Sequence, residues 1–302
     1  MLPGLLNTFL DYLLPIFLVI ALSAYLGKKL ALDTKMLSSL VVNVFTPFLV
    51  IQTLSSSHLE GSEVGKIAIM ALAAPTIMLI AGIGISKLMK LSRNIEGAFV
   101  LSVFLGNMAA MGFSINEFVY GPDGLQRAVL YFAIATAYTT PVAIFFASRG
   151  KRSAMDSFKN VIKSPITYAT ILGLILNFTG RHLPLPLERF TELMAQSTVP
   201  GLLIILGVQL GRIKVRSNIG AVIAASATRL ILAPAAGFAL AALLGMSGLT
   251  RSVSIIESSV PTALFATAFA IEFGSDGDFT TAVSLVTTIG SVITLTLLIT
   301  LL

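Results

Sequence analysis

Ten strongly apolar stretches take up almost the whole chain and limit it to one kind of fold. A helix needs about 20 apolar residues to cross the hydrocarbon core of a bilayer. Only 11% of the 302 residues are charged, and the mean hydropathy is +0.93. The pattern predicts an all-α, multi-pass membrane protein with ten transmembrane helices over the ranges 9–27, 36–54, 66–86, 96–117, 126–148, 164–180, 193–211, 218–244, 251–272 and 279–301.

The composition argues against several other classes of protein. The chain contains no cysteine, which leaves no disulfide, thiol nucleophile or thiolate metal site. His58 and His182 fall in expected loops without metal-binding spacing, and Asp276 with Asp278 suits a solvated turn or a cap on the tenth helix better than a metal site. We therefore expect no enzyme, no cofactor other than a sodium ion, and no nucleic-acid partner.

Basic residues are unequally shared between the two sets of connections. Fourteen Lys and Arg residues follow helices one, three, five and seven, whereas the opposite connections hold only five. Because cytoplasmic loops carry the excess of Lys and Arg, we expect a plasma membrane protein, such as one of the bacterial inner membrane, with both termini outside. The richest segment, 149–163, is then a cytoplasmic linker between the ranges 1–148 and 164–302.

Two of the apolar ranges are broken by residues that do not suit a membrane helix. One break runs from Gly106-Asn107 to Gly112, and the other from Glu257 through Pro261. Backbone groups freed from a helix find no water in hydrocarbon, so breaks are tolerated only inside protein or around a cavity. Discontinuous helices that face each other at the bilayer midplane are typical of secondary transporters.

A repeat is suggested by the spacing of kinks and breaks. Pro47 and Pro200 interrupt helices two and seven, Asn107 follows Pro47 by 60 positions, and Pro261 follows Pro200 by 61. Because five helices per unit is an odd number, the second unit crosses the membrane in the reverse sense, which predicts a 5+5 inverted repeat. The alternative is coincidence, since proline is common in membrane helices.

Four polar residues at the breaks or inside a membrane range could carry the chemistry. The amide of Asn107 suits a carboxylate or a cation. The alternative is that it serves only as an interhelical hydrogen bond that holds the bundle together. Glu257 and Ser258 offer oxygen atoms for sodium, or a carboxylate that carries a proton. Arg229 could bind an anionic substrate, but we favour its pairing with Glu257 because intramembrane charges usually pair. Weaker candidates, interpreted as packing or capping groups, are Thr46, Thr136, Tyr138, Thr139 and Gln209.

Several motifs along the chain resemble the auxin efflux carrier family, which shares its fold with the sodium/bile acid symporters. The resemblance implies a scaffold domain from helices one, two, six and seven, and a core from helices three to five and eight to ten. Helices four and nine would cross at their breaks. The motifs are Asn43–Pro47, Leu105-Gly106-Asn107 with Gly112, Ser259–Ala263, Ala270–Asp276 and Thr281–Ser284.

The resemblance also implies a function and a site. Thr46, Asn107 and Pro261 would line the substrate site, together with their neighbours Gly106, Gly112, Ser259 and Thr262. Family members often have proline after the helix-four glycine, where this chain has Phe113-Ser114.

We expect a secondary active transporter that moves a small organic anion, a carboxylate or an auxin-like molecule, by alternating access. The expected partners are that anion, the lipid bilayer and a second copy of the chain in a homodimer. The alternatives are a sodium-coupled bile-acid-type symporter and a non-transporting membrane sensor.

Overall fold

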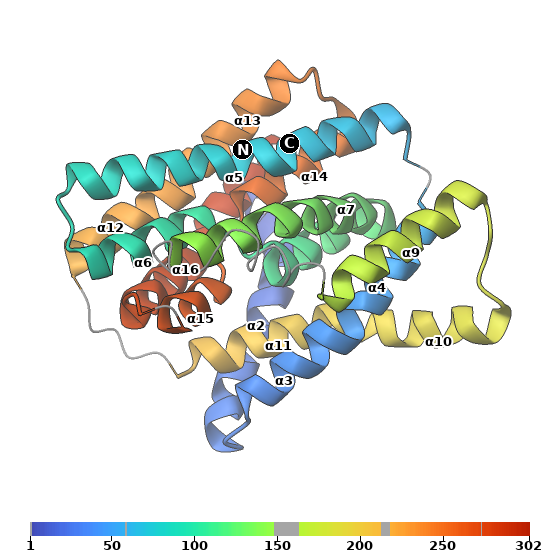
Figure 1. Ribbon diagram of the computed structural model, residues 1–302, viewed down its shortest axis with the longest axis horizontal. Coiled ribbons are helices and arrows are strands. Elements are labelled where there is room, and N and C mark those ends of the chain that lie inside the picture. Colours follow the sequence, from blue (N-terminus) through green and yellow to red (C-terminus); the bar gives the residue numbers. More distant parts are fainter. Residues whose placement is uncertain (1, 58, 148–162, 213–217, 273) are drawn as a thin grey trace.

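The computed structural model describes residues 2–57, 59–147, 163–212, 218–272 and 274–302, and the long regular elements within them are all helices (Figure 1). The expected linker 149–163 lies outside the described residues except for Lys163, and so do the basic residues Lys214 and Arg216 and the loop residue His58. In Figure 1, α4, α9 and α10 lie toward one end of the molecule and α6, α12 and α15 toward the other.

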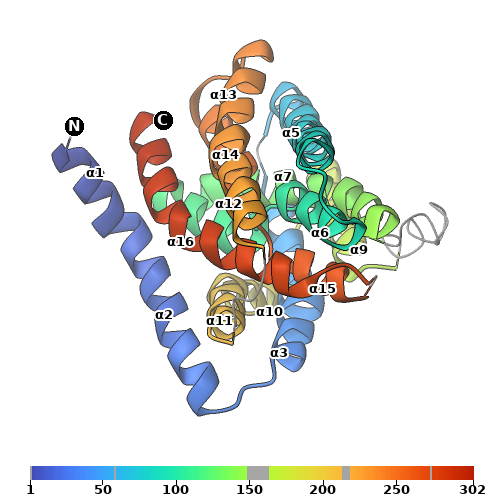
Figure 2. The same cartoon turned by 90° about the vertical axis from the view of Figure 1, so that its left-hand side faces the viewer.

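The first half of the chain begins with a long helical rod along one edge of the molecule (Figure 2). Its elements are α1 (Leu2–Thr8), the π-helical turn η1 (Phe9–Leu13), α2 (Leu14–Lys29), α3 (Thr34–Leu40), the π-helical turn η2 (Val41–Phe45), α4 (Thr46–Ser55), α5 (Gly61–Leu88), α6 (Arg93–Phe104), the π-helical turn η3 (Met108–Phe113) and α7 (Ser114–Ala147).

The second half repeats the use of short helices joined end to end. Its elements are α9 (Pro165–Thr179), α10 (Leu185–Gln196), α11 (Thr198–Leu210), α12 (Ile219–Ala227), the π-helical turn η4 (Thr228–Leu232), α13 (Ala233–Leu243), α14 (Gly248–Ser259), α15 (Phe265–Glu272) and α16 (Gly277–Leu301).

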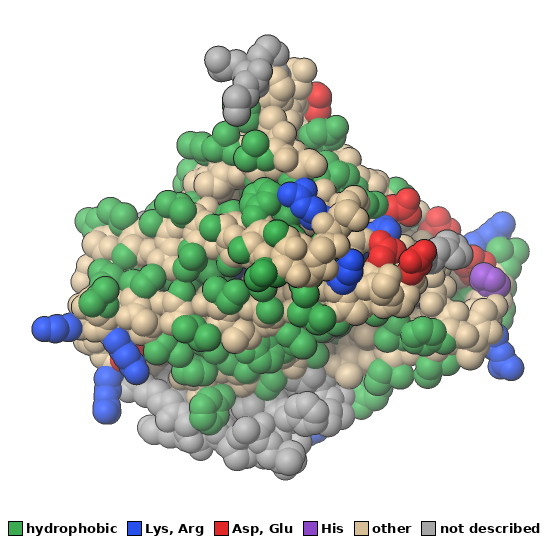
Figure 3. All heavy atoms as spheres, turned by 90° about the horizontal axis from the view of Figure 1, so that it is seen from above, with side chains coloured by type: hydrophobic (Ala, Val, Ile, Leu, Met, Phe, Trp, Pro, Cys, Tyr) green, Lys and Arg blue, Asp and Glu red, His purple; other side chains and the backbone are tan. Residues whose placement is uncertain are grey.

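Seven helical spans among the described residues are long and apolar enough to cross a membrane. The chain is therefore a multi-pass membrane protein, and Figure 3 shows apolar side chains over much of one face, with charged side chains at both ends and in one group between them. The spans are Gly4–Lys29, Thr34–Ser55, Gly61–Leu88, Met108–Phe146, Leu185–Leu210, Ile219–Leu243 and Gly277–Leu301.

Seven spans are fewer than the ten expected ranges, for identifiable reasons. The range 251–272 is interrupted between α14 and α15, and the helix Pro165–Thr179 has only 15 residues. The range 96–117 is interrupted after α6, and its remainder merges with the following range in Met108–Phe146. That merged span is itself bent, because Gly121 has a φ of 65° that leaves the helical region and is followed by Pro122.

Three of the four π-helical turns end two residues before a proline. Pro15, Pro47 and Pro234 each stand at the second position of the helix that follows η1, η2 or η4. Proline lacks the N–H that would bond the carbonyl four residues earlier, and its ring clashes with that carbonyl. A wider turn relieves the clash, so each proline explains the π-helical turn in front of it.

Other expectations about the helices fare differently. Asp276 accepts a hydrogen bond from the backbone N–H of Phe279 at 2.9 Å, which confirms it as the cap of the last helix. The seventh expected range, 193–211, begins earlier in the structure. The amphipathic helix α10 starts at Leu185 and is followed by α11 after Ser197. Pro200 therefore lies in the first turn of α11, a position that tolerates proline.

Packing brings the two halves of the chain together. α2 packs along α11, α4 along α9, and α14 along both α7 and α13. The two termini lie close together in both views (Figures 1 and 2), and the hydroxyls of Thr300 and Thr8 are 3.1 Å apart. This arrangement places η3, η4 and the end of α14 in the interior.

Candidate functional site at the two helix breaks

The two unwound segments lie against each other as a short piece of antiparallel β-structure. α6 ends at Phe104, α14 ends at Ser259, and both chains then become extended. Gly106 and Thr262 form an antiparallel bridge. The backbone N–H of Asn107 donates to Pro261 O at 2.8 Å, and that of Ala263 donates to Leu105 O at 2.9 Å. The expected meeting of the two breaks is therefore present.

The interior around the bridge satisfies much of the backbone that the breaks release. Thr262 Oγ1 donates to Ser102 O at 2.7 Å, in the last turn of α6. The backbone N–H of Thr262 donates in turn to Thr287 Oγ1 at 3.1 Å, on α16. A buried carbonyl without a partner is costly in a membrane interior, and the Thr262 hydroxyl removes that cost at Ser102. Thr262 therefore joins the second break to the first by its side chain, in addition to the backbone bridge with Gly106.

Arg229 does not pair with Glu257, contrary to our expectation. Its side chain is buried, and the guanidinium donates to Val260 O at 2.8 Å, Val103 O at 3.2 Å and Ser258 O at 3.2 Å. An ion pair joins Arg127 to Glu63 elsewhere in the molecule. The break carbonyls take the place of the carboxylate that we expected, because they lie at the ends of two helices where carbonyl groups lack donors.

Glu257 is fully buried and contacts the other broken helix. Its Oε1 accepts a hydrogen bond from Asn116 Nδ2 at 3.0 Å, and its Oε2 has no partner among the described residues. The carboxylate rests on Gly112, where a Cβ atom would overlap both carboxylate oxygens. The glycine at this position is therefore what lets the acidic side chain of α14 reach η3 and α7.

Asn116 belongs to the site although we did not predict it. Its Nδ2 donates both to Glu257 and to Gly112 O at 2.9 Å, while its Oδ1 has no partner in the described structure. Asn116 follows Gly112 by four positions, so the two share one helix face. That spacing is the signal in the sequence by which it could have been found.

Asn107 occupies the junction itself. Its backbone carbonyl accepts from the N–H of Met111 at 3.1 Å, so the residue caps η3. The residue as a whole is 8% exposed, and its side-chain amide forms no hydrogen bond within the part of the chain that the structure describes. An amide without a protein partner remains available for a ligand.

A small cavity lies beside the bridge. It has room for about one water molecule, so an organic anion does not fit there in this conformation. Arg229 and Glu257 contribute to its wall from different elements, η4 and α14. The lining residues are Ala74, Pro75, Met78, Phe104, Gly106, Met108, Tyr131, Thr139, Arg229, Glu257 and Ser258.

The remaining predicted residues differ in where they lie. Ser258 and Ser259 sit at the second break and donate their hydroxyls to Ile255 O, at 2.8 Å and 2.6 Å. Thr46 does not line the cavity and donates its hydroxyl to Val41 O at 2.9 Å, in the π-helical turn η2 that precedes α4. The predicted residues from Gly106 to Gly112, Arg229, and those from Glu257 to Thr262 thus lie around the two breaks, whereas Thr46 and the kink prolines Pro47 and Pro200 lie on α4 and α11.

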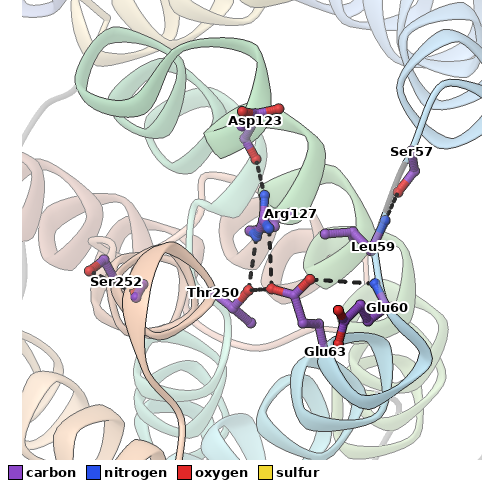
Figure 4. Close-up of polar contacts among 9 residues, drawn as sticks. Ser57, Leu59, Glu60, Glu63, Asp123, Arg127, Thr250 and Ser252 are labelled. Carbon is purple, nitrogen blue, oxygen red and sulfur yellow. Dashed lines mark hydrogen bonds and ion pairs between the residues drawn. The ribbon is translucent and has the colours of Figure 1, made fainter.

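The opposite end of α14 is held by a polar cluster (Figure 4). Arg127 on α7 donates to Thr250 Oγ1 at 2.8 Å and pairs with Glu63 Oε1 at 3.1 Å. Thr250 also donates to Glu63, and Glu63 closes a capping box with Glu60 at the start of α5. The half-helix that carries Glu257 is therefore fixed at both ends, by this cluster and by the bridge.

Known proteins resemble the chain over almost its full length. An uncharacterised transporter of Methanothermobacter thermautotrophicus is 25% identical over 286 residues, which cover 93% of this chain and 94% of the relative. An uncharacterised transporter of Methanocaldococcus jannaschii is 25% identical over 261 residues, covering 82% and 84%.

The family comparison agrees with these relatives and with the motifs at the breaks. The profile of the membrane transport protein family matches residues 8–161 and 153–299, so both broken helices fall within the matched ranges. The resemblance to the auxin efflux carriers is thereby confirmed, and the chain belongs to the membrane transport protein family.

Proposed function

We propose that the protein is a secondary active transporter of a small organic anion, a carboxylate or an auxin-like molecule. The observation that carries the proposal is the β-bridge between Gly106 and Thr262, with the unpaired amide of Asn107 beside it. Paired unwound segments in the membrane interior are the usual construction of a transport site. The membrane transport protein family, and the two relatives described as transporters, support a transport function.

The proposed anion site lies at the N-terminal end of the second half of the broken helix. η3 begins at Met108 directly after the bridge, and the N–H groups of a helix start attract negative charge. The Asn107 amide would donate to the carboxylate of the substrate. Arg229 is not needed as a direct ligand in this arrangement, because its donors already bind three backbone carbonyls.

We propose Glu257 and Asn116 as the site of the coupling ion, sodium or a proton. Glu257 Oε2 and Asn116 Oδ1 are buried and have no partner among the described residues, and they belong to side chains joined by a hydrogen bond. Carboxylate and amide oxygens are ligands that hard cations prefer. A proton on Glu257 would equally satisfy the free carboxylate oxygen, because a protonated carboxyl is a donor.

A groove supplies the proposed route to the site. It is lined by Leu72, Ala133, Ile134, Ala137, Tyr138 and Thr170, which belong to α5, α7 and α9. Tyr138 hydrogen-bonds Thr76 at 2.8 Å, and its ring meets that of Phe104 edge to face at 6.3 Å. Since Phe104 lines the small cavity, this aromatic pair stands between the groove and the breaks. Transport then requires the core to move against the scaffold.

The ten-helix plan remains part of the proposal. We count α6, η3 and the arm of α7 before Gly121 as one membrane pass, and the arm after Gly121 as the next. With α9 as one pass and α14 with α15 as another, this yields five passes per half. An inverted repeat of this kind places the two breaks at the midplane, with both termini on the outer side of the plasma membrane. Scanning cysteine accessibility at both termini tests that orientation.

The transport experiment uses purified protein in proteoliposomes and a panel of radiolabelled carboxylates. We expect saturable uptake of at least one small carboxylate, reduced at least tenfold by Asn107→Ala. Replacement of sodium by choline, and collapse of the pH gradient, identify the coupling ion. Uptake of bile acids that requires sodium would favour a bile-acid-type symporter. Ligand binding without flux would indicate a sensor and contradict the proposal.

A further inference from the structure

Arg229 carries a buried charge that no acidic side chain in the described residues neutralises. Its three acceptors are backbone carbonyls, and they come from both broken helices: Val103 from α6, Ser258 and Val260 from the end of α14 and the residue after it. Few other side chains could reach all of them, because guanidinium presents its donors in a rigid, branched plane.

These carbonyls lack their normal helical donors for a specific reason. In an unbroken helix, Val103 O would accept from the N–H of Asn107, and Ser258 O from that of Thr262. Asn107 N–H binds Pro261 O instead, and Thr262 N–H binds Thr287 Oγ1. The bridge bond of Asn107 and the bond of Thr262 to α16 therefore leave Val103 O and Ser258 O without their helical donors, and Arg229 supplies the donors instead.

The charge of Arg229 also matches the field of the two helix ends. The C-terminal end of a helix acts like roughly half a negative charge. α6 and α14 both end at the bridge, so about one positive charge between them is sufficient to cancel both ends. The guanidinium is in hydrogen-bond contact with each end, at the position where this cancellation is most effective.

Two local features make room for this arrangement. A Cβ atom on Gly106 would overlap Arg229 Nη2, so glycine opposite Thr262 leaves the guanidinium room in its observed position. Arg229 itself lies on the π-helical turn η4, which precedes Pro234. A wider turn changes the direction in which its side chains leave the helix.

We propose that Arg229 is a positioning residue that clamps the two helix breaks together, rather than a ligand of the transported anion. It neutralises the C-terminal ends of α6 and α14 and leaves the N-terminal end at Met108 free for the substrate. The role of Arg229 as a clamp follows from its contacts alone. The statement that the anion binds at Met108 and not at Arg229 rests on the proposed function.

The test measures the bridge without any substrate. The chain has no native cysteine, so Leu105→Cys and Ala263→Cys introduce a single pair across the bridge. Residues opposite each other in an antiparallel pair have Cα atoms roughly 5.5 Å apart, a distance that a disulfide can span. The rate of disulfide formation under copper phenanthroline is then read from the mass of the alkylated protein.

In this background we expect Arg229→Met to slow disulfide formation at least tenfold, and Arg229→Lys to lie between it and the parent. Arg251→Met is the matched control, because Arg251 lies on α14 over the ring of Phe238 and away from the clamp. It should cross-link like the parent. In the cysteine-free chain, we expect uptake to follow the same order among the variants whose unfolding temperature is close to that of the parent.

Disulfide formation at the parental rate in Arg229→Met would overturn the clamp, even if uptake were lost. If that variant does not fold, Arg229→Lys and Gly106→Ala decide the matter, the latter because it displaces the guanidinium and keeps the charge. Parental rates in both would overturn the proposal. A chain that transports no anion but shows slowed cross-linking would contradict the proposed function and leave the clamp standing.

Discussion

Asn116 Nδ2 lies 3.0 Å from Glu257 Oε1, which joins two side chains that are 141 positions apart in the chain. Each residue carries one buried oxygen without a partner in the described structure. Because Asn116 lies on α7, directly after the first break, and Glu257 lies in the last turn of α14 before the second, this hydrogen bond couples the two halves of the molecule at the proposed ion site.

Asn107→Ala should reduce uptake at least tenfold with little loss of folded protein. The change removes an amide that forms no hydrogen bond in the described structure, so the fold loses no side-chain partner, while the backbone bond to Pro261 is kept. Initial uptake rates in proteoliposomes and the size-exclusion profile measure the two effects. Uptake kinetics equal to those of the parent would remove Asn107 from the proposed anion site.

Glu257→Gln should alter the ion dependence of uptake. The variant keeps the size of the side chain and an oxygen for the Asn116 donor, but it can neither release a proton nor hold the charge that balances sodium. We expect uptake to lose its response to the coupling gradient, measured with imposed sodium and pH gradients. An unchanged response to both gradients would leave Glu257 with a structural role only.

Gly112→Ala should abolish transport. The new Cβ would overlap both carboxylate oxygens of Glu257 and push α14 away from η3. Gly84→Ala is the matched control, since a Cβ on that glycine of α5 meets no atom within 4 Å. We expect Gly84→Ala to transport normally with equal or slightly higher stability, because alanine is the better helix former. Equal activity of the two variants would contradict the tight contact at Gly112.

Thr262→Val should destabilise the protein by about 1 to 3 kcal/mol, the usual effect of leaving a buried acceptor unpaired. The acceptor is Ser102 O, which receives the Thr262 hydroxyl at 2.7 Å. Thr262→Ser keeps the hydroxyl and should stay close to the parent. Chemical or thermal unfolding in detergent compares the three proteins, and a valine variant as stable as the serine variant would count against this hydrogen bond.

Phe104→Ala should open the wall between the groove and the cavity at the breaks. Phe104 lines the cavity, and its ring packs against Tyr138, which lines the groove. A cysteine placed at Thr139, which lines the cavity, should then react faster with a thiol reagent than it does in the parent background. Equal reaction rates would show that the aromatic pair does not control access. Phe145→Ala, on the same helix as Tyr138, serves as the comparison because Phe145 is exposed.

The sequence alone determined the class of fold and the location of both breaks. The apolar ranges follow from composition over about 20 residues, and the breaks follow from Gly106-Asn107 and Pro261, residues whose effect on a helix is local. The asparagine, proline and glycine motifs also sufficed to identify the family. Asp276 was recognisable as a helix cap for the same reason, since a cap depends on residues only a few positions away.

The tertiary structure decided which groups the buried charges contact. Arg229 was expected to pair with Glu257, yet it binds the carbonyls of Val103, Ser258 and Val260, and Glu257 binds Asn116. No periodicity or composition encodes these partners, because each depends on how helices far apart in the chain pack. In a low-dielectric interior the negative C-terminal ends of two helices can attract a cation as a carboxylate does. Arg229 contacts the helix ends rather than Glu257 because α6 and α14 end at the same point in the fold.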